Sequence, residues 1–503
     1  MDVFWTAFRV PNLLRRLFGE GALSAAFVPV FTQVARAEGW EKARIVLANV
    51  TGWLALILAG LLLAGELLIS AWLLLGRGNW EALLLGKLIM IMLPFMVTIC
   101  VLALGSAALN CKGHFAYPAF APIILNLSLI AAAWYVGRSG RADTWAGLFM
   151  LSAAVVVAGL VQVAGVLWLL RQAKLASLPT LRPVLPELHR ISSMVLPMMI
   201  PLGLLQLSSL FDSIYALVMS AAPDAAPLRL LGVEIHRPLE VGVVTRLFAA
   251  NRLYQFPMGI LAISLATAVF PLLSRHAADN DMPGLRHTTN RALRLSLFLG
   301  VPSGVALLLL AEPVIAIIYR TGEFTPADVR QSAAILQMYC LGMWAYFCNH
   351  ILLRVFFAIK ETKTPLRIAS GLVIVNVVLV MLLVFTPLEG AGIGLATAIT
   401  ASLNSLLLAL LIRRRLGGDL GAAEIFVSLL GTFAATTAMA GAIFAVRWAL
   451  PTWLPKARSE WVLLPASVVA GSLTFLACAA VLRCRELTEL RKSAAVDAGL
   501  GGD

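Results

Sequence analysis

Long apolar runs are the feature that most limits how this chain can fold. Few or no charged residues occur in Val46–Leu75, Ala119–Tyr135, Leu366–Phe385 and Trp461–Leu482. A helix rises about 1.5 Å per residue, so each run is long enough to cross a hydrocarbon core of about 30 Å. Inside a bilayer only helices and closed barrels satisfy every backbone amide. Because the runs lack the two-residue alternation of barrel strands, α-helices are favoured.

The composition agrees with a membrane protein. Of the 503 residues, 60% are apolar and 13% are charged, whereas soluble domains are about 45–50% apolar and about 25% charged. A net charge of +13 could indicate a nucleic-acid partner. The basic residues, however, lie in short loops between apolar runs, which is typical of the positive-inside pattern. We therefore expect no nucleic-acid partner.

We predict an all-α polytopic membrane protein with about thirteen transmembrane helices. The predicted spans cover residues 3–31, 45–75, 83–111, 119–136, 144–170, 192–221, 241–273, 295–318, 331–358, 366–386, 390–412, 424–448 and 461–482. One alternating set of loops and the C-terminal tail carries most of the loop lysines and arginines, so this set is expected to be cytoplasmic. The six cysteines show no framework spacing, and we expect no disulfide.

Charged side chains inside the first predicted span are a second informative feature. A charge at the bilayer centre costs at least about 2.5–3.5 kcal/mol, and such charges usually face a cavity. On a helix Arg9, Asn12 and Arg16 share a face. Asp2 lies seven residues before Arg9, and Arg15 stands beside that face. The alternative is a cluster that snorkels to the membrane interface.

A second arginine lies within the span at 241–273. Arg252 could bind a phosphate group through two hydrogen bonds. The amides of Asn251 and Gln255, four residues apart on one face, could bind sugar hydroxyls. A buried structural pair is the alternative. Together with the first span, Arg252 indicates a cationic cavity for an anionic substrate, and Arg354 is a third candidate that could instead snorkel.

Three further polar residues are candidates for ion binding. Asp212 is the one acid well inside the span at 192–221, and it could hold a cation or a proton. Asn376 and Thr397 could add oxygen ligands from two later spans. Hydrogen bonding between helices is the alternative interpretation of all three.

Several motifs, in order along the chain, resemble a known family. They are the segment Arg9–Ala22 (RVPNLLRRLFGEGA), then Ala26–Pro29, Pro118–Pro122 with Asn126, Asn251–Pro257, Phe270–Ser274, Gly322–Thr325 and Lys363–Pro365. The set is similar to the signature of the MurJ/MviN lipid II flippases. The resemblance covers essentially the whole chain, and its first motif is highly specific.

The resemblance implies a fourteen-helix fold of the multidrug/oligosaccharidyl-lipid/polysaccharide exporter superfamily. Two six-helix lobes would form a V around a cationic cavity, and two C-terminal helices would add a lipid-tail groove. Applied here, this gives an N-terminal lobe at 1–221, a C-terminal lobe at 222–415, the extra helices at 416–483 and a cytoplasmic tail at 484–503.

The implied activity is transport rather than catalysis. Lipid II, an undecaprenyl-pyrophosphate-linked disaccharide-pentapeptide, would move from the cytoplasmic to the outer leaflet of the bacterial inner membrane by alternating access. The drive would come from the membrane potential or from sodium ion or proton coupling, with no other cofactor. The expected partners are lipid II, membrane lipids and the cell-wall synthesis machinery, and the expected state is a monomer.

The resemblance also assigns site residues. Arg15 and Arg252 match two cavity arginines that contact the pyrophosphate. The other expected substrate-binding residues are Asp2, Arg9, Asn12, Thr245, Asn251 and Gln255. At Asn251 and Gln255 many members carry acids, so this cavity is expected to be more positive than usual.

Two departures from the family pattern bear on function. The chain starts where the family's second helix begins, so we expect Met1 to be a misassigned start, the alternative being a truncated copy. Asp212, Asn376 and Thr397 match a sodium site of some members, but Val380 stands where those members carry an acid, which argues against sodium binding.

Other readings of the sequence are a flippase for another undecaprenyl-pyrophosphate-linked oligosaccharide, an antiporter of the same superfamily, and a non-transporting scaffold. A membrane glycosyltransferase would need an exposed catalytic acid, for which Glu323 and Asp328 are the candidates.

Overall fold

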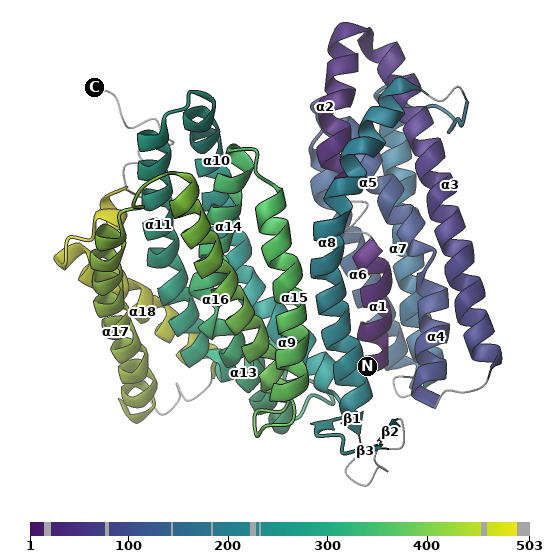
Figure 1. Cartoon of the computed structure of the whole chain (residues 1–503). Coiled ribbons are helices and arrows are strands. Elements are labelled where there is room, and N and C mark those ends of the chain that lie inside the picture. The colour runs from purple at the N-terminus through teal and green to yellow at the C-terminus, as the bar shows by residue number, and fades with distance from the viewer. Residues whose placement is uncertain are drawn as a thin grey trace. The chain divides into compact units, whose positions relative to one another are not determined.

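The computed structural model describes residues 1–14, 22–75, 80–141, 144–182, 185–221, 228–230, 233–453 and 460–489. The chain divides into two compact units, Met1–Val218 and Met219–Asp503 (Figure 1). Each unit is built almost entirely of helices, as the apolar runs predict.

The first unit contains eight helices among its described residues. They are α1 (Asp2–Leu14), α2 (Ala22–Ala37), α3 (Gly39–Leu74), α4 (Trp80–Met92), α5 (Phe95–Cys111), α6 (Ala116–Arg138), α7 (Trp145–Gln172) and α8 (Pro186–Met219). Helix α5 packs against α2, α3 and α7, while α4 packs against α1 and α7 (Figure 1). The span predicted at 3–31 corresponds to α1 and α2, and residues 15–21 between them lie outside the described residues.

The segment between α7 and α8 is fastened along α3. The Thr180 N–H donates to the Ala48 carbonyl at 3.1 Å, and the Asn49 side-chain amide donates to the Thr180 carbonyl at 3.2 Å. The Trp53 indole N–H donates to the Leu181 carbonyl at 3.2 Å. A Cβ atom at Gly52 would lie only 2.4 Å from the Thr180 carbonyl oxygen. The close approach of this segment to α3 therefore requires glycine.

The second unit begins with short strands and continues as helices. Strand β1 (Ser220–Ala221) pairs in parallel with β4 (Leu239–Glu240), and β2 (Leu228–Leu230) pairs antiparallel with β3 (Val233–Ile235). The helices are α9 (Val243–Pro257), the π-helical turn η2 (Met258–Ala262), α10 (Ile263–Ala278), α11 (Met282–Leu309), α12 (Ala311–Tyr319), α13 (Pro326–Leu341), α14 (Met343–Ala358), α15 (Lys363–Leu383), α16 (Gly390–Arg415), α17 (Ala422–Trp453) and α18 (Glu460–Val481).

One predicted span is bent. Helices α13 and α14 occupy the span predicted at 331–358, and they meet at Gly342 with an angle of 45°. A Cβ atom at Gly342 would lie 2.8 Å from Ala398 Cα on α16. Glycine therefore lets α16 approach the bend closely.

Helices α11, α14 and α16 share an apolar core in the second unit, which includes Leu293, Phe356 and Leu408. Helices α17 and α18 pack on α11, where the rings of Phe298 and Phe475 lie 5.0 Å apart (Figure 1).

The helical fold class is confirmed, but the number of spans is not. Ten described helices are long and apolar enough to cross a membrane, or up to eleven if the bent pair counts as one span. The difference from thirteen arises at the spans predicted at 3–31 and 192–221, which are absent from this set. The four short strands β1–β4 were not among the predicted elements.

Candidate functional site

Helix α9 has two contrasting faces. Val243, Arg246, Leu247, Ala250 and Tyr254 are buried on one face. This face packs on α13, and the Tyr254 ring stacks on Tyr339 of α13 at 4.7 Å. With about 100° between successive residues, the opposite face carries Thr245, Phe248, Arg252 and Gln255, which are half-buried except for the exposed Arg252. Four of the predicted site residues lie on α9, and three of them share this open face.

Arg246 anchors the buried face near the start of α9. Its Nε atom donates to Asp328 Oδ1 at 2.8 Å, and its Nη2 atom donates to the Val241 carbonyl at 2.8 Å. Asp328 also closes a capping box with Thr325 at the start of α13. Arg246 was not among the predicted site residues. Its position six residues before Arg252, in the same apolar span, was the signal that could have identified it.

The open face of α9 carries a polar stripe. The Arg252 guanidinium lies over the Phe248 ring, 5.0 Å from its centroid. The Gln255 side-chain amide donates to Asn251 Oδ1, so these two neutral residues are joined along the helix. The stripe thus offers one cation, amide groups and the Thr245 hydroxyl.

In the first unit the predicted residues lie on α1. Asp2 is buried and Asn12 is half-buried. The Arg9 guanidinium donates to Ser209 on α8, at 2.6 Å to its carbonyl and 2.8 Å to its hydroxyl. Arg9 therefore ties α1 to α8. Arg15 lies outside the described residues.

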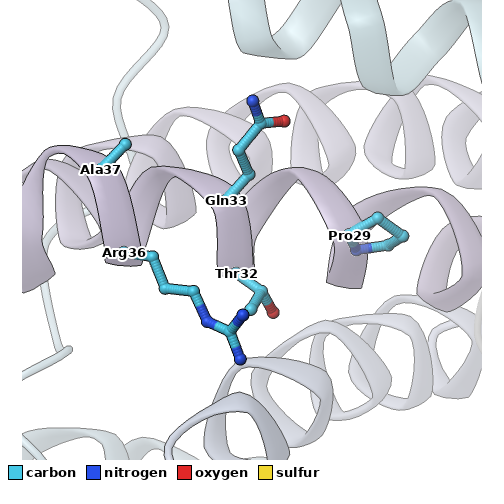
Figure 2. Close-up of a pocket in the computed structure, with 5 residues that line it drawn as sticks. All are labelled: Pro29, Thr32, Gln33, Arg36 and Ala37. Atoms are coloured by element: carbon cyan, nitrogen blue, oxygen red, sulfur yellow. The ribbon is translucent and has the colours of Figure 1, made fainter.

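A groove of about 560 Å³ runs along one face of α2, lined by Pro29, Thr32, Gln33, Arg36 and Ala37. Figure 2 shows that Arg36 and Thr32 point to the same side of α2. Arg190 of α8 donates to Gln33 at 2.9 Å. Arg36 stands in the last turn of α2, where a cation offsets the helix dipole.

The three residues that match a sodium site, Asp212, Asn376 and Thr397, lie on α8, α15 and α16. Asp212 is half-buried on α8. Asn376 on α15 accepts a hydrogen bond from Thr400 at 3.3 Å, and the Thr397 hydroxyl donates to the Ile393 carbonyl at 3.1 Å. Val380, one turn after Asn376, is buried. In the second unit these positions therefore supply neutral oxygen atoms beside an apolar side chain.

Arg354 on α14, like Arg252, packs its guanidinium on a phenylalanine ring. Its guanidinium lies over the Phe270 ring of α10, 5.2 Å from the centroid. Arg354 is half-buried, so this contact joins α14 to α10.

The long apolar helices of the two units define a polytopic membrane protein. In the second unit, helix α9 presents the exposed Arg252 opposite its anchored face. The solved structure of a lipid II flippase MurJ in an inward closed conformation aligns with 96% of this chain and 92% of its own, at a TM-score of 0.74 and 23% identity. An inward-facing MATE family transporter of the MOP superfamily aligns with 82% of this chain and 93% of its own, at a TM-score of 0.64 and 14% identity. At these identities the likeness concerns the fold.

Sequence comparison gives the family. A family model described as "Lipid II flippase MurJ" matches residues 1–459. The probable lipid II flippase MurJ of Vibrio cholerae is 31% identical over 96% of this chain and 90% of its own length. The lipid II flippase MurJ of Burkholderia cenocepacia is 32% identical over 82% of this chain and 77% of its own. The chain belongs to the lipid II flippase MurJ family, whose members are transporters and not enzymes.

Proposed function

We propose that this protein moves lipid II from the cytoplasmic to the outer leaflet of the bacterial inner membrane by alternating access, with Arg252 contacting the pyrophosphate. Membership of the family supports the substrate. The single observation that supports the role of Arg252 is its exposure on α9, opposite the face anchored to α13.

The chemistry of Arg252 suits the substrate. A guanidinium stays charged and donates hydrogen bonds in a fixed fork, which fits the oxygen atoms of a phosphate group. The amides of Asn251 and Gln255 would then lie beside the first sugar. Arg15 is proposed as a second pyrophosphate contact, on the family motif alone.

The distribution of basic loops supports a cytoplasmic C-terminus. Three arginines of the last turn of α16, Arg413–Arg415, lie just beyond the span predicted at 390–412, on the side expected to be cytoplasmic. We further propose that the protein acts as a monomer and meets the cell-wall synthesis machinery at the membrane.

The test is complementation of a bacterial strain depleted of its lipid II flippase. Arg252→Ala should abolish growth at normal membrane levels of the protein, and Arg252→Lys should rescue only in part. Arg275→Ala, an exposed arginine at the end of α10, is the matched control and should complement fully. Full complementation by Arg252→Ala would refute the assigned role of Arg252. Failure of the unmodified chain, inserted in the membrane, would favour another lipid-linked oligosaccharide.

A membrane glycosyltransferase is not favoured. Of its two candidate acids, Asp328 is bound to Arg246 and to the start of α13.

A further inference from the structure

The second half of α3 presents a long exposed surface. Helix α3 forms an edge of the first unit (Figure 1), and all its described residues after Leu58 are exposed or half-buried. Helix α4 covers one side, where a Cβ atom at Gly65 would lie 2.8 Å from the Leu93 side chain. Much of the remaining surface is apolar, with Leu63 63% and Leu68 72% exposed.

Two tryptophans mark the ends of the membrane-embedded part of α3. The Trp53 N–H donates to the Leu181 carbonyl of the segment between α7 and α8, and the exposed Arg182 follows at once, so this level is at water. Trp72, which is 40% exposed, comes 19 residues after Trp53, or about 28 Å along the helix. This distance matches a hydrocarbon core of about 30 Å with tryptophans at its two surfaces.

Glu66 lies inside this embedded part. It comes six residues before Trp72, or about 9 Å below the nearer membrane surface. Side chains on a helix point toward its N-terminus, so the carboxyl group is directed away from that surface. Among the described residues, no hydrogen bond or ion pair includes the Glu66 side chain. Lys87 of the neighbouring α4 lies over the Trp145 ring of α7 instead.

Glu66 belongs to a stripe with the spacing of a helix–helix contact. Ala59, Leu63, Glu66 and Ser70 follow one another at intervals of four, three and four residues, which is the spacing of the packed positions in paired helices. Ala59 and Leu63 are exposed, and Glu66 and Ser70 are half-buried. The small Ala59 permits a close approach. Lipid tails can cover the leucine of this stripe, but they offer nothing to a carboxyl group.

We propose that this stripe is the docking surface for a transmembrane helix of another membrane protein, which presents a lysine or arginine to Glu66. A basic side chain supplies the opposite charge and the hydrogen bonds that the carboxylate needs inside the bilayer. Lipid amines stay at the headgroup level, above Glu66. A second copy of this chain would bring two carboxyl groups into one apolar interface. The inference goes beyond the proposed function and does not depend on the role of Arg252.

The first experiment uses the purified full chain in phosphatidylcholine vesicles, with model transmembrane peptides as the probe. Each peptide is a leucine-rich helix of about 20 residues with lysine, leucine or glutamate at the depth of Glu66. Energy transfer between labelled protein and labelled peptide measures their association. Polar contacts between membrane helices should make the lysine peptide bind about 3- to 30-fold more tightly than the leucine peptide.

Variants of the stripe sharpen this test. Glu66→Gln should remove the preference for lysine, and Glu66→Lys should transfer it to the glutamate peptide. Leu63→Ala and Leu68→Ala are a matched pair, because both leucines are exposed on α3 and only Leu63 lies in the stripe. Leu63→Ala alone should weaken binding. Equal binding of the lysine and leucine peptides would overturn the proposal, and so would Glu66-dependent energy transfer between two labelled copies of the chain.

A second experiment looks for the partner in the native bacterium. A photo-crosslinking amino acid at residue 63 should capture a membrane protein, whereas the same group at residue 68 should not. Glu66→Gln should abolish the adduct. In a Glu66→Lys background, glutamate in place of the basic residue of the captured helix should restore it. An adduct that survives Glu66→Gln, or none at residue 63, would refute the docking role. Lipid II flipping in vesicles should be unchanged by Glu66→Gln, so failure here leaves the proposed function untouched.

Discussion

Arg294 of α11 and Glu486, just after α18, form a buried ion pair with a distance of 2.7 Å between Nη1 and Oε1. Arg294 also donates to Asn290 at 3.0 Å and to Glu489 at 3.3 Å. Asn290 in turn donates to the Leu420 carbonyl before α17 at 2.6 Å. Neighbouring residues of α11 thus bind the segment before α17 and the segment after α18.

Breaking this ion pair should destabilise the protein strongly. Glu486→Leu leaves the buried Arg294 charge without its shortest contact, which typically costs about 3–5 kcal/mol. The Arg294→Met/Glu486→Leu double variant should be less destabilised than Glu486→Leu alone, because no buried charge is left behind. Thermal unfolding in detergent measures both. Equal destabilisation by the single and the double change would contradict this account.

The bend at Gly342 should not tolerate a larger residue. Gly342→Val places atoms where a Cβ already lies 2.8 Å from Ala398 Cα, and overpacking typically costs about 1–3 kcal/mol. Gly371→Ala on α15 is the control, since nothing lies within 4 Å of its Cβ position. The unfolding temperature should fall for the first variant only. A stable Gly342→Val protein would show that α16 can move away from the bend.

Acid should weaken the attachment of α9 to α13. Burial alone would raise the pKa of Asp328, but hydrogen bonds from Thr325 and Arg246 outweigh it and lower the pKa below the ordinary 3.8. A carboxyl with a lowered folded-state pKa contributes stability above its unfolded pKa and loses it as the pH falls through the folded value. The contribution should therefore be constant at neutral pH and decline below about pH 3.8. Asp328→Asn should flatten this part of a stability profile measured against pH.

Sodium should have little effect on this protein. Asp212 is the one acid among the three candidate residues, Asn376 and Thr397 supply neutral oxygen atoms, and Val380 adds no charge. We therefore expect no sodium-dependent rise in unfolding temperature when sodium replaces potassium. Val380→Asp places a carboxylate one turn from Asn376, and it should create such a rise if the positions form a site. A sodium response of the unmodified protein would contradict the interpretation of Val380.

The sequence predicted the helices well because a membrane span is a local property. Runs of apolar residues and the spacing of Arg252, Asn251 and Gln255 along one helix need no knowledge of partners. Contacts between distant residues were beyond such reasoning. Arg9 meets Ser209 two hundred residues later, and Arg246 meets Asp328, with no sequence pattern that links either pair.

The bend within the span at 331–358 and the roles within α9 show the same limit. Hydropathy merges α13 and α14 into one span, because the bend at Gly342 depends on packing against α16. Which face of α9 is buried also depends on Tyr339, on another helix. The sequence also showed no sign that the Arg252 guanidinium packs on the Phe248 ring.

The segment fastened to α3 restricts how α8 can move. The Leu185 N–H donates to Asn49 of α3, and α8 begins at the next residue, Pro186. Because the first turn of α8 directly follows Leu185, which is hydrogen-bonded to α3, movement of this end of the helix is restricted. We therefore expect the start of α8 to act as a fixed pivot, so that any excursion of this helix during a transport cycle is a swing whose amplitude grows toward Met219.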